Sequence, residues 1–364
     1  MLTFARLILG WGTVAAFLLF SPFLLGDLSS SLYAALLFVG LVIVILWSAF
    51  SVVGEADHLA EMLGEPLGTL ILTLSIVLIE VVLISAVMLG EKQVATLGRD
   101  TMFAVLMIVL NGVVGLGLLI GGLRHHEQSY NLQGAGAYFA VIIPLSIIIF
   151  VLPNFTISTP GGTLTIAQEI AFSVFTLVLY GIFLLVQTGR HRGFFVDPGF
   201  DPAKPRNAHE VPTATAIGKH TGLLLISVLP IVLLAKKLAV LIDHELDVLA
   251  APPILGGVLI AMVVFAPEGI SALRAVTSNQ LQRGINLCLG AAASTIGLTV
   301  PAIVAISVLS KQTIVLGLAP AQMVLLATTL LLSTLTFSRT RTTLLEGAMH
   351  LVVFFVYVTL IFSP

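Results

Sequence analysis

Charged residues are scarce in this chain. Of its 364 residues, 9% are charged and 58% are hydrophobic, and the mean hydropathy is +1.12. Roughly a quarter of the residues in a soluble domain are charged, so this composition excludes an ordinary soluble fold. The formal net charge is -2, and no basic patch is interleaved with aromatic residues. The sequence therefore predicts no nucleic-acid partner.

Cysteine and the motifs of common enzyme classes are also missing. The one cysteine, Cys288, lies in an apolar stretch and has no second cysteine with which to form an intrachain disulfide. Neither a Walker motif nor an H-E-x-x-H zinc motif occurs. No nucleophile and base can be placed together near the middle of an apolar segment. We therefore expect no cofactor and no enzymatic activity.

Long apolar runs make up most of the chain. A helix needs about 20 apolar residues to cross a bilayer, whereas a membrane β-barrel would show alternating segments of about ten residues. The sequence predicts an all-α, polytopic membrane protein of about 11 transmembrane helices. The expected spans are 5–25, 31–53, 66–90, 101–122, 135–153, 167–188, 219–241, 251–275, 282–309, 314–336 and 343–362.

The chain contains an internal repeat. The segment Gly68–Val87 aligns with Gly256–Ala275, so that Glu80 falls on Glu268, a shift of 188 positions. The same shift carries the spans that start near residues 31, 135 and 167 onto positions 219, 323 and 355. We divide the chain into an extra N-terminal helix, a first five-helix repeat, a cytoplasmic linker and a second five-helix repeat, at 1–27, 28–189, 190–217 and 218–364. Because five is odd, the second repeat enters the membrane from the opposite side, as in many secondary transporters.

Lysine and arginine are distributed unevenly between the two faces of the membrane. With a cytoplasmic N-terminus, eleven of the 16 Lys and Arg residues lie on the cytoplasmic face. The positive-inside rule thus predicts a cytoplasmic N-terminus and, after eleven crossings, an external C-terminus. Membrane lipid is then a partner of most spans. The sequence leaves the oligomeric state open, and a homo-oligomer is one option.

Two glutamates lie near the middle of predicted spans. Glu80 and Glu268 each follow the first glycine of the repeat segment by twelve residues, or about 18 Å of helix. A charged carboxylate at that depth costs about 2.5–3.5 kcal/mol, so an intramembrane acid is a functional-site hypothesis by default. Burial disfavours the ionised carboxylate, which is stabilised when a proton or a cation neutralises it. The proton and the cation compete for the same carboxyl oxygens. Polar contacts between helices are the alternative role, and the repeat symmetry of the pair favours the functional one.

Neighbouring residues must complete a cation site, because Ca²⁺ prefers six to eight oxygen ligands. At 100° per residue, Thr69 and Thr73 share a helix face with Glu80. Ser271 shares a face with Glu268 in the same way. Hydroxyl groups therefore line the acid face of both predicted helices.

Three further positions are candidates for the ion pathway. Pro267 has no N–H to donate to the carbonyl of Val263, so that oxygen is available to a cation or to water, although a simple kink is an equal alternative. Asn111 is a mid-membrane polar residue of the span after Glu80, and Ser294 with Thr295 occupies the comparable place in the second half. For these polar residues, hydrogen bonding between helices is favoured over direct ligation.

Two segments carry a resemblance to a known family. At Gly64–Val81 and Phe265–Ala302, the sequence resembles the bacterial calcium/proton antiporters of the ChaA type, within the calcium/cation antiporter superfamily. The resemblance implies an inverted-repeat exchanger of the bacterial cytoplasmic membrane, with a sodium/calcium exchanger-like fold. It also implies that Glu80 and Glu268 bind the metal cation and carry protons, and that Ca²⁺, Na⁺, K⁺ and H⁺ are the transported ions.

The chain departs from the superfamily at one point. The wider superfamily often has an asparagine three residues before each acid, where this chain has Val77 and Phe265. Asparagine oxygens are therefore missing from those places in the ligand set. This thinner set is compatible with exchange of sodium and potassium as well as calcium.

The sequence thus predicts secondary active transport, in which inward-moving protons drive the export of Ca²⁺, or of Na⁺ and K⁺, by alternating access around the two glutamates. A sodium/calcium exchanger of the same fold is the closest alternative. A cation channel is a weaker one, because an inverted repeat with two acids suits coupled exchange better. The dependence of calcium flux on sodium or on a pH gradient separates the first two.

Overall fold

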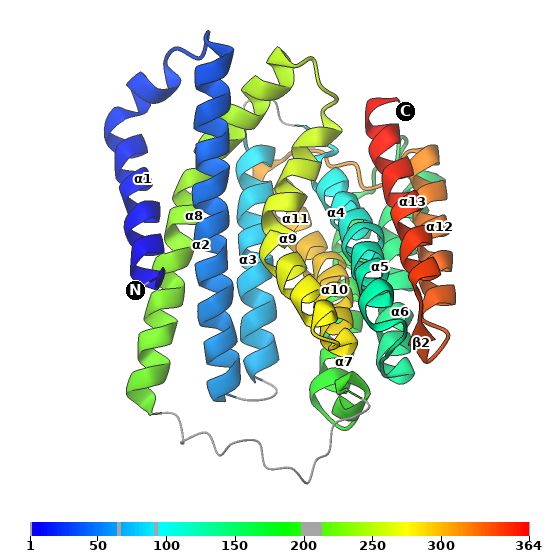
Figure 1. The fold of residues 1–364 in the computed structure, drawn as a ribbon. Helices are drawn as coiled ribbons and strands as arrows, with labels where there is room; N and C mark the ends of the chain where they lie inside the picture. Colours follow the sequence, from blue (N-terminus) through cyan, green and yellow to red (C-terminus); the bar gives the residue numbers. More distant parts are fainter. Residues whose placement is uncertain (1, 64–66, 91–93, 198–212, 364) are drawn as a thin grey trace. The chain divides into compact units, whose positions relative to one another are not determined.

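Helices account for nearly all of the secondary structure (Figure 1). The structure is a computed structural model that describes residues 2–63, 67–90, 94–197 and 213–363, without side chains at 2–4 and 67–70. Its long helices are α1 Leu2–Leu25, α2 Ser31–Leu63, α3 Leu67–Met88, α6 Leu132–Ser146, α7 Ile166–Thr188, α8 Ala214–Val248, α9 Ile254–Thr277, α12 Pro320–Thr336 and α13 Leu344–Phe362. Two others are interrupted by π-helical segments: α4 Leu97–Met107, η1 Ile108–Val113 and α5 Val114–His125 form one, and α10 Leu281–Ser294, η5 Thr295–Thr299 and α11 Val300–Ser310 the other.

Short elements connect some of the helices. The π-helical η2 Ile147–Val151 and the 3-10 helix η3 Leu152–Phe155 follow α6, and the 3-10 helix η4 Arg192–Phe195 follows α7. The two-residue strands β1 Gln128–Ser129 and β2 Arg341–Thr342 pair antiparallel. Most of the predicted linker, 198–212, lies outside the described residues.

The predicted spans are present as helices. In the described part of the chain, ten helical stretches are long and apolar enough to cross a membrane, and α12 is a shorter apolar helix. This confirms the all-α, polytopic fold. The predicted bounds of three spans were wrong, because α2 and α8 continue past residues 53 and 241, and α12 begins at Pro320 and not at 314. Charged residues end an apolar window but not a helix, and Glu55, Ala56 and Leu59 remain buried in the extension of α2.

The internal repeat is visible in the helices themselves. A shift of 188 positions carries α3 onto α9, the segment α4–η1–α5 onto α10–η5–α11, and the start of α6 at Leu132 onto the start of α12 at Pro320. Each interrupted helix thus has its π-helical segment at an equivalent position. The last pair departs from this register, since α13 begins at Leu344, before the position expected from α7. The chain between α12 and α13 is shorter than the chain that carries η2 and η3 between α6 and α7.

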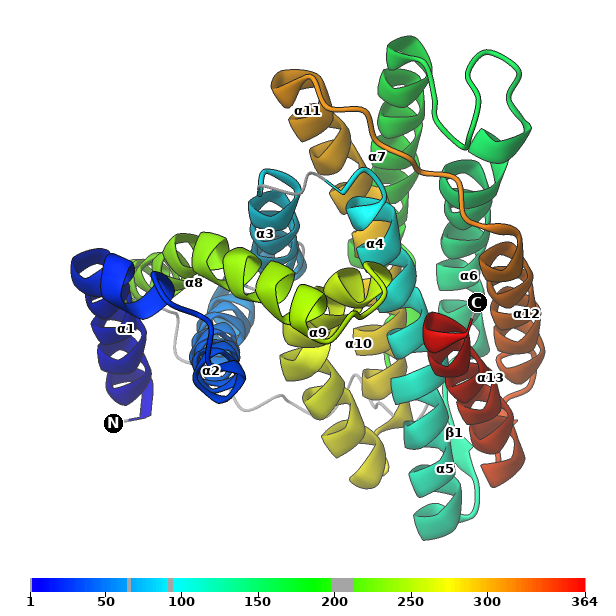
Figure 2. The ribbon, with the colours of Figure 1, turned by 90° about the horizontal axis from the view of Figure 1, so that it is seen from above.

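The first compact unit comprises residues 1–97 and 205–267, with α1, α2, α3, α8 and the first part of α9. These four complete helices lie side by side (Figure 2). The equivalent helices α2 and α8 run antiparallel, because Glu55 contacts His220 at one level (2.6 Å) and Ser51 contacts Ser227 at another (3.3 Å). Opposite directions for equivalent helices are what an inverted repeat requires.

The second compact unit comprises residues 98–204 and 268–364, with the remaining helices and the last part of α9. Glycines bring η1 and α5 close to α13: an added Cβ at Gly115 of α5 would lie 2.9 Å from the Cβ of His350, and one at Gly112 of η1 would lie 3.3 Å from the ring of Phe354. Small residues allow this approach of two helix backbones, which is the usual basis of helix association in membranes.

Gly347 provides a test of this close packing. A Cβ at Gly347 would lie against the backbone nitrogen of Leu119 and 2.8 Å from the carbonyl oxygen of Gly115, whereas a Cβ at Gly181 in α7 meets nothing within 4 Å. Because backbone atoms cannot rotate away, we expect Gly347→Ala to lower the free energy of unfolding by about 1–3 kcal/mol. The matched change Gly181→Ala should be neutral or slightly stabilising. Thermal unfolding of the purified protein in detergent measures both, and equal melting temperatures would contradict the packing described.

Candidate functional site

Glu80 lies in the interior of α3 in the first unit. Its side chain is 1% exposed, and apolar side chains on the same helix, Ile79, Leu83 and Ile84, are buried around it. Thr73, two turns before it, is half-buried, and the side chain of Thr69 lies outside the described residues. The buried carboxyl group is thus set in a predominantly apolar helix, as the sequence predicts.

Glu268 occupies the equivalent place in α9. It is 4% exposed and follows Pro267 directly. The two compact units divide between these two residues, although α9 is a continuous helix across them. Proline at 267 has no N–H for the carbonyl of Val263, so the helix lacks one backbone hydrogen bond just before the acid. Ser271 lies most of a turn beyond Glu268 and is half-buried.

Asn111 lies inside the π-helical segment η1 of the second unit and is fully buried. Its Nδ2 donates to Oγ1 of Thr329 on α12 at 2.8 Å, and its Oδ1 lies 3.2 Å from Nδ1 of His350 on α13. Nε2 of His350 lies 3.1 Å from Oγ1 of Thr336. The amide of Asn111 therefore joins three helices through a chain of buried polar groups.

The hydrogen bonding between helices that the sequence favours for Asn111 is present, but His350 was not predicted as its partner. His350 is a titratable residue within the predicted span 343–362, and that alone was a signal. Its partner Asn111 lies 239 positions away, and neither residue is part of a recognisable motif.

The counterpart of Asn111 in the second repeat is Thr299, in η5, rather than Ser294 or Thr295. The shift of 188 positions relates these two residues, and both lie in π-helical segments. Thr299 is fully buried, and its hydroxyl has no hydrogen-bond partner among the described residues. The hydroxyl of Ser294 donates to the carbonyl of Ala291 at 3.0 Å within its own helix. Single-turn π segments inside α-helices occur frequently at functional sites.

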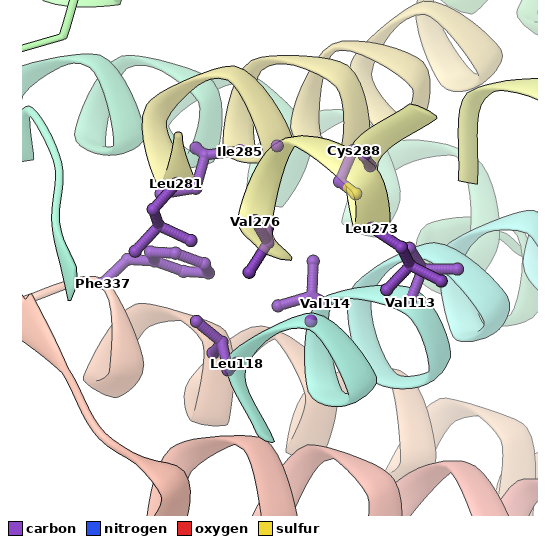
Figure 3. Close-up of a pocket in the computed structure, with 12 residues that line it drawn as sticks. Val113, Val114, Leu118, Leu273, Val276, Leu281, Ile285, Cys288 and Phe337 are labelled. Atoms are coloured by element: carbon purple, nitrogen blue, oxygen red, sulfur yellow. The ribbon is translucent and has the colours of Figure 1, made fainter. Parts of the chain in front are cut away.

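A small apolar cavity lies beside the C-terminal part of α9 in the second unit (Figure 3). Its volume is about 20 Å³, room for about one water molecule. Ala272 and Val276, which share the α9 face of Glu268, line one side, and Val113 and Val114 of η1 and α5 line another. Such a lining offers a cation no oxygen side chain at this cavity.

The predicted site residues are divided between the two units. Glu80, Thr73 and Val263 belong to the first, and Asn111, Glu268, Ser271 and Ser294 belong to the second. Within the described residues, no group of three His, Cys, Asp or Glu side chains is arranged to hold a metal ion. A cation bound at either acid must therefore draw on hydroxyl groups, backbone carbonyls or water for the rest of its shell.

Comparisons with known proteins agree with this architecture. The profile of the sodium/calcium exchanger protein family matches residues 33–189 and 219–363, one stretch in each repeat. The chain is 41% identical to y4hA of Sinorhizobium fredii, named as an ionic transporter, over 87% of this chain and 86% of that protein. It is 38% identical to the sodium-potassium/proton antiporter ChaA of Escherichia coli, over 88% of this chain and 87% of that protein.

Solved structures share the fold at lower identity. YfkE superposes with a TM-score of 0.76 at 18% identity, covering 99% of this chain and 100% of that one. The H⁺/Ca²⁺ exchanger CAX gives a TM-score of 0.63 at 14% identity, covering 98% and 87%. The family profile and the two relatives each cover most of the chain. The chain therefore belongs to the sodium/calcium exchanger protein family.

Proposed function

We propose that this protein exchanges Ca²⁺, Na⁺ or K⁺ for protons across the membrane, with Glu80 and Glu268 as the groups that bind the cation and carry the protons. The observation that supports this most strongly is the pair itself. Two buried glutamates, 1% and 4% exposed, occupy equivalent positions in the two repeats. A channel has no need of two such acids, and an exchanger has a direct use for them.

The exchange follows from the cost of burying charge. A carboxylate surrounded by apolar side chains is expensive unless a proton or a cation neutralises it. Loading a cation therefore requires that the acid release its proton, and reloading the proton expels the cation. A divalent ion can replace two protons with no change in the charge of the site. Alternating access around the two acids then couples the two fluxes.

The choice of ions follows from the ligand set. The positions three residues before the acids are Val77 and Phe265, both buried and apolar. Without amide oxygens there, the site has fewer ligands for Ca²⁺, which suits a transporter that also accepts monovalent ions. The relative ChaA is named for sodium and potassium exchange against protons. Sodium/calcium exchange remains the alternative, and it would make calcium flux depend on sodium.

The proposal extends to the location of the protein, its orientation in the membrane and its partners. The protein acts as a transporter in the bacterial cytoplasmic membrane and not as an enzyme, with its N-terminus inside and its C-terminus outside. Residues 28–189 and 218–364 form the two repeats, joined by a cytoplasmic linker. Its partners are the transported ions, membrane lipid and, in a homo-oligomer, further copies of the chain.

Glu80→Gln and Glu268→Gln should each abolish coupled exchange, because an amide can neither give up a proton nor balance the charge of a cation. The measurement is the rise in internal pH of acid-loaded inside-out vesicles when Ca²⁺, Na⁺ or K⁺ is added. Glu127→Gln removes the same charge at a residue that is half-exposed and paired with Arg341. It should leave exchange unchanged. Normal exchange by either buried-acid variant would remove the proposed mechanism.

Val77→Asn should shift the preference of the protein toward calcium. The new amide lies about one turn before Glu80 and supplies an oxygen ligand, so the KM for Ca²⁺ should fall about tenfold relative to the KM for Na⁺. Proton efflux is measured against each ion over a concentration series. Val81→Asn is the matched control, since it places the same amide beside Glu80 on another face of α3. If Val77→Asn changes the KM for Ca²⁺ and the KM for Na⁺ by the same factor, position 77 does not select the ion.

A further inference from the structure

His350 is held by hydrogen bonds at both ring nitrogens inside the second unit. Nδ1 faces Asn111 at 3.2 Å and Nε2 faces Thr336 at 3.1 Å. His350 and Asn111 are 0% exposed, and Thr336 is 3% exposed. Burying an imidazole without hydrogen-bond partners costs free energy. The two bonds offset that cost and allow His350 to be buried in this membrane-spanning helix.

The direction of these bonds follows from the chemistry of the groups. An amide oxygen can only accept, so with the amide of Asn111 as it lies in the structure, Nδ1 of His350 carries the hydrogen and donates it. In the neutral ring, Nε2 then accepts from the hydroxyl of Thr336. Nδ2 of Asn111 donates in turn to Thr329 at 2.8 Å. The amide of Asn111 is thus fixed on both sides.

The position of Asn111 makes this fixation relevant to the site. It lies in η1, and η1 packs against α10, α12 and α13 within the second unit. Val113 and Val114, the residues that follow, line the same cavity as Ala272, which is one turn beyond Glu268 on α9. A shift of η1 would therefore move Val113 and Val114. These two side chains form the wall of the cavity beside α9, the helix that carries Glu268.

The two repeats differ at this point. Asn111 is tied to α12 and α13, whereas its counterpart Thr299 has no hydrogen-bond partner for its hydroxyl among the described residues. Polar side chains therefore brace the π-helical segment η1 and leave η5 without an equivalent brace at this position. Asn111 in the first repeat is thus braced by two side chains of the second repeat, Thr329 and His350.

We propose that His350 is a positioning residue for exchange: by fixing the amide of Asn111, it holds η1, and with it the wall beside the Glu268 helix, in the geometry that binds the transported cation. This rests on the proposed function. His350 acts through Asn111 and does not itself carry the exchanged proton.

Three substitutions separate the two hydrogen bonds of His350. An asparagine amide stands in for Nδ1, a glutamine amide stands in for Nε2, and leucine replaces neither. We expect His350→Asn to keep the cation KM near that of the wild type. His350→Gln and His350→Leu should each raise it about tenfold, the effect of one unsatisfied buried polar group, while the maximal rate changes less. Rescue by Gln and not by Asn would overturn the proposal.

The decisive experiment is a double-mutant cycle with His350→Leu and Asn111→Ala, measured as cation-dependent proton efflux in vesicles. If His350 acts through Asn111, the double variant should have the same cation KM as Asn111→Ala alone, because nothing is left to position. Additive losses in KM would overturn the proposal, as would a wild-type KM in His350→Leu.

Two further measurements distinguish failure of the role of His350 from failure of the proposed function. Tyr357→Phe lies two turns further along α13, is equally buried, and removes a hydroxyl without a hydrogen-bond partner among the described residues. It should leave the KM unchanged, and a rise equal to that of His350→Leu would show that any change in α13 disturbs binding and so overturn the specific role. Wild-type vesicles without any cation-dependent efflux would contradict the proposed function itself.

Discussion

A carboxylate buried in the hydrocarbon region must be neutralised, and the organisation of this protein can be understood from that requirement. Glu80 and Glu268 are 1% and 4% exposed in helices whose other residues are mostly apolar. Neither acid has a lysine or arginine on its own helix at mid-span. Under the proposed function, a bound cation or proton supplies neutralising charge that the acid's own helix does not. Exchange of one neutralising ion for another is then the activity that we propose for the pair.

The rest of the chain supplies what such a site needs. Inverted repeats place the two acids equivalently, and the antiparallel pairing of α2 with α8 is the direct structural sign of that inversion. Pro267 removes a backbone hydrogen bond beside one acid, at the point where the two compact units divide. Glycines at the α5–α13 contact allow the close approach that brings His350 to Asn111. The hydrogen bond between His350 and Asn111 in the second unit therefore depends on the close packing of α5 and α13.

Much of the fold could be predicted because hydropathy and buried charge are written directly in the sequence. The spans, the repeat and the two acids each depend on residues near one another in the chain or on a fixed shift of 188 positions. The extended ends of α2 and α8 could not be predicted this way, since residues such as Glu55 are buried by partners from another helix. The π-helical segments and the Asn111–His350 contact depend on packing between distant segments, and hydropathy does not describe it.

The candidate site was predicted in part. The interior positions of Glu80 and Glu268 follow from helix length, and the shift of 188 positions in the sequence also pairs Asn111 with Thr299. The prediction that Ser294 and Thr295 occupy the place of Asn111 was therefore wrong by a few positions. The structure adds that Asn111 and Thr299 both lie in π-helical segments, which a hydropathy pattern does not show.

Exchange at Glu80 and Glu268 requires that a cation and protons compete for the same two carboxyl groups, and this competition is measured as proton release when the cation binds. Purified protein in weakly buffered detergent solution is titrated with Ca²⁺, and the released protons are counted per ion bound. We expect a release approaching two protons per Ca²⁺ in the wild type and none in the Glu80→Gln, Glu268→Gln double variant. Binding of Ca²⁺ without proton release, or an unchanged release in the double variant, would contradict it.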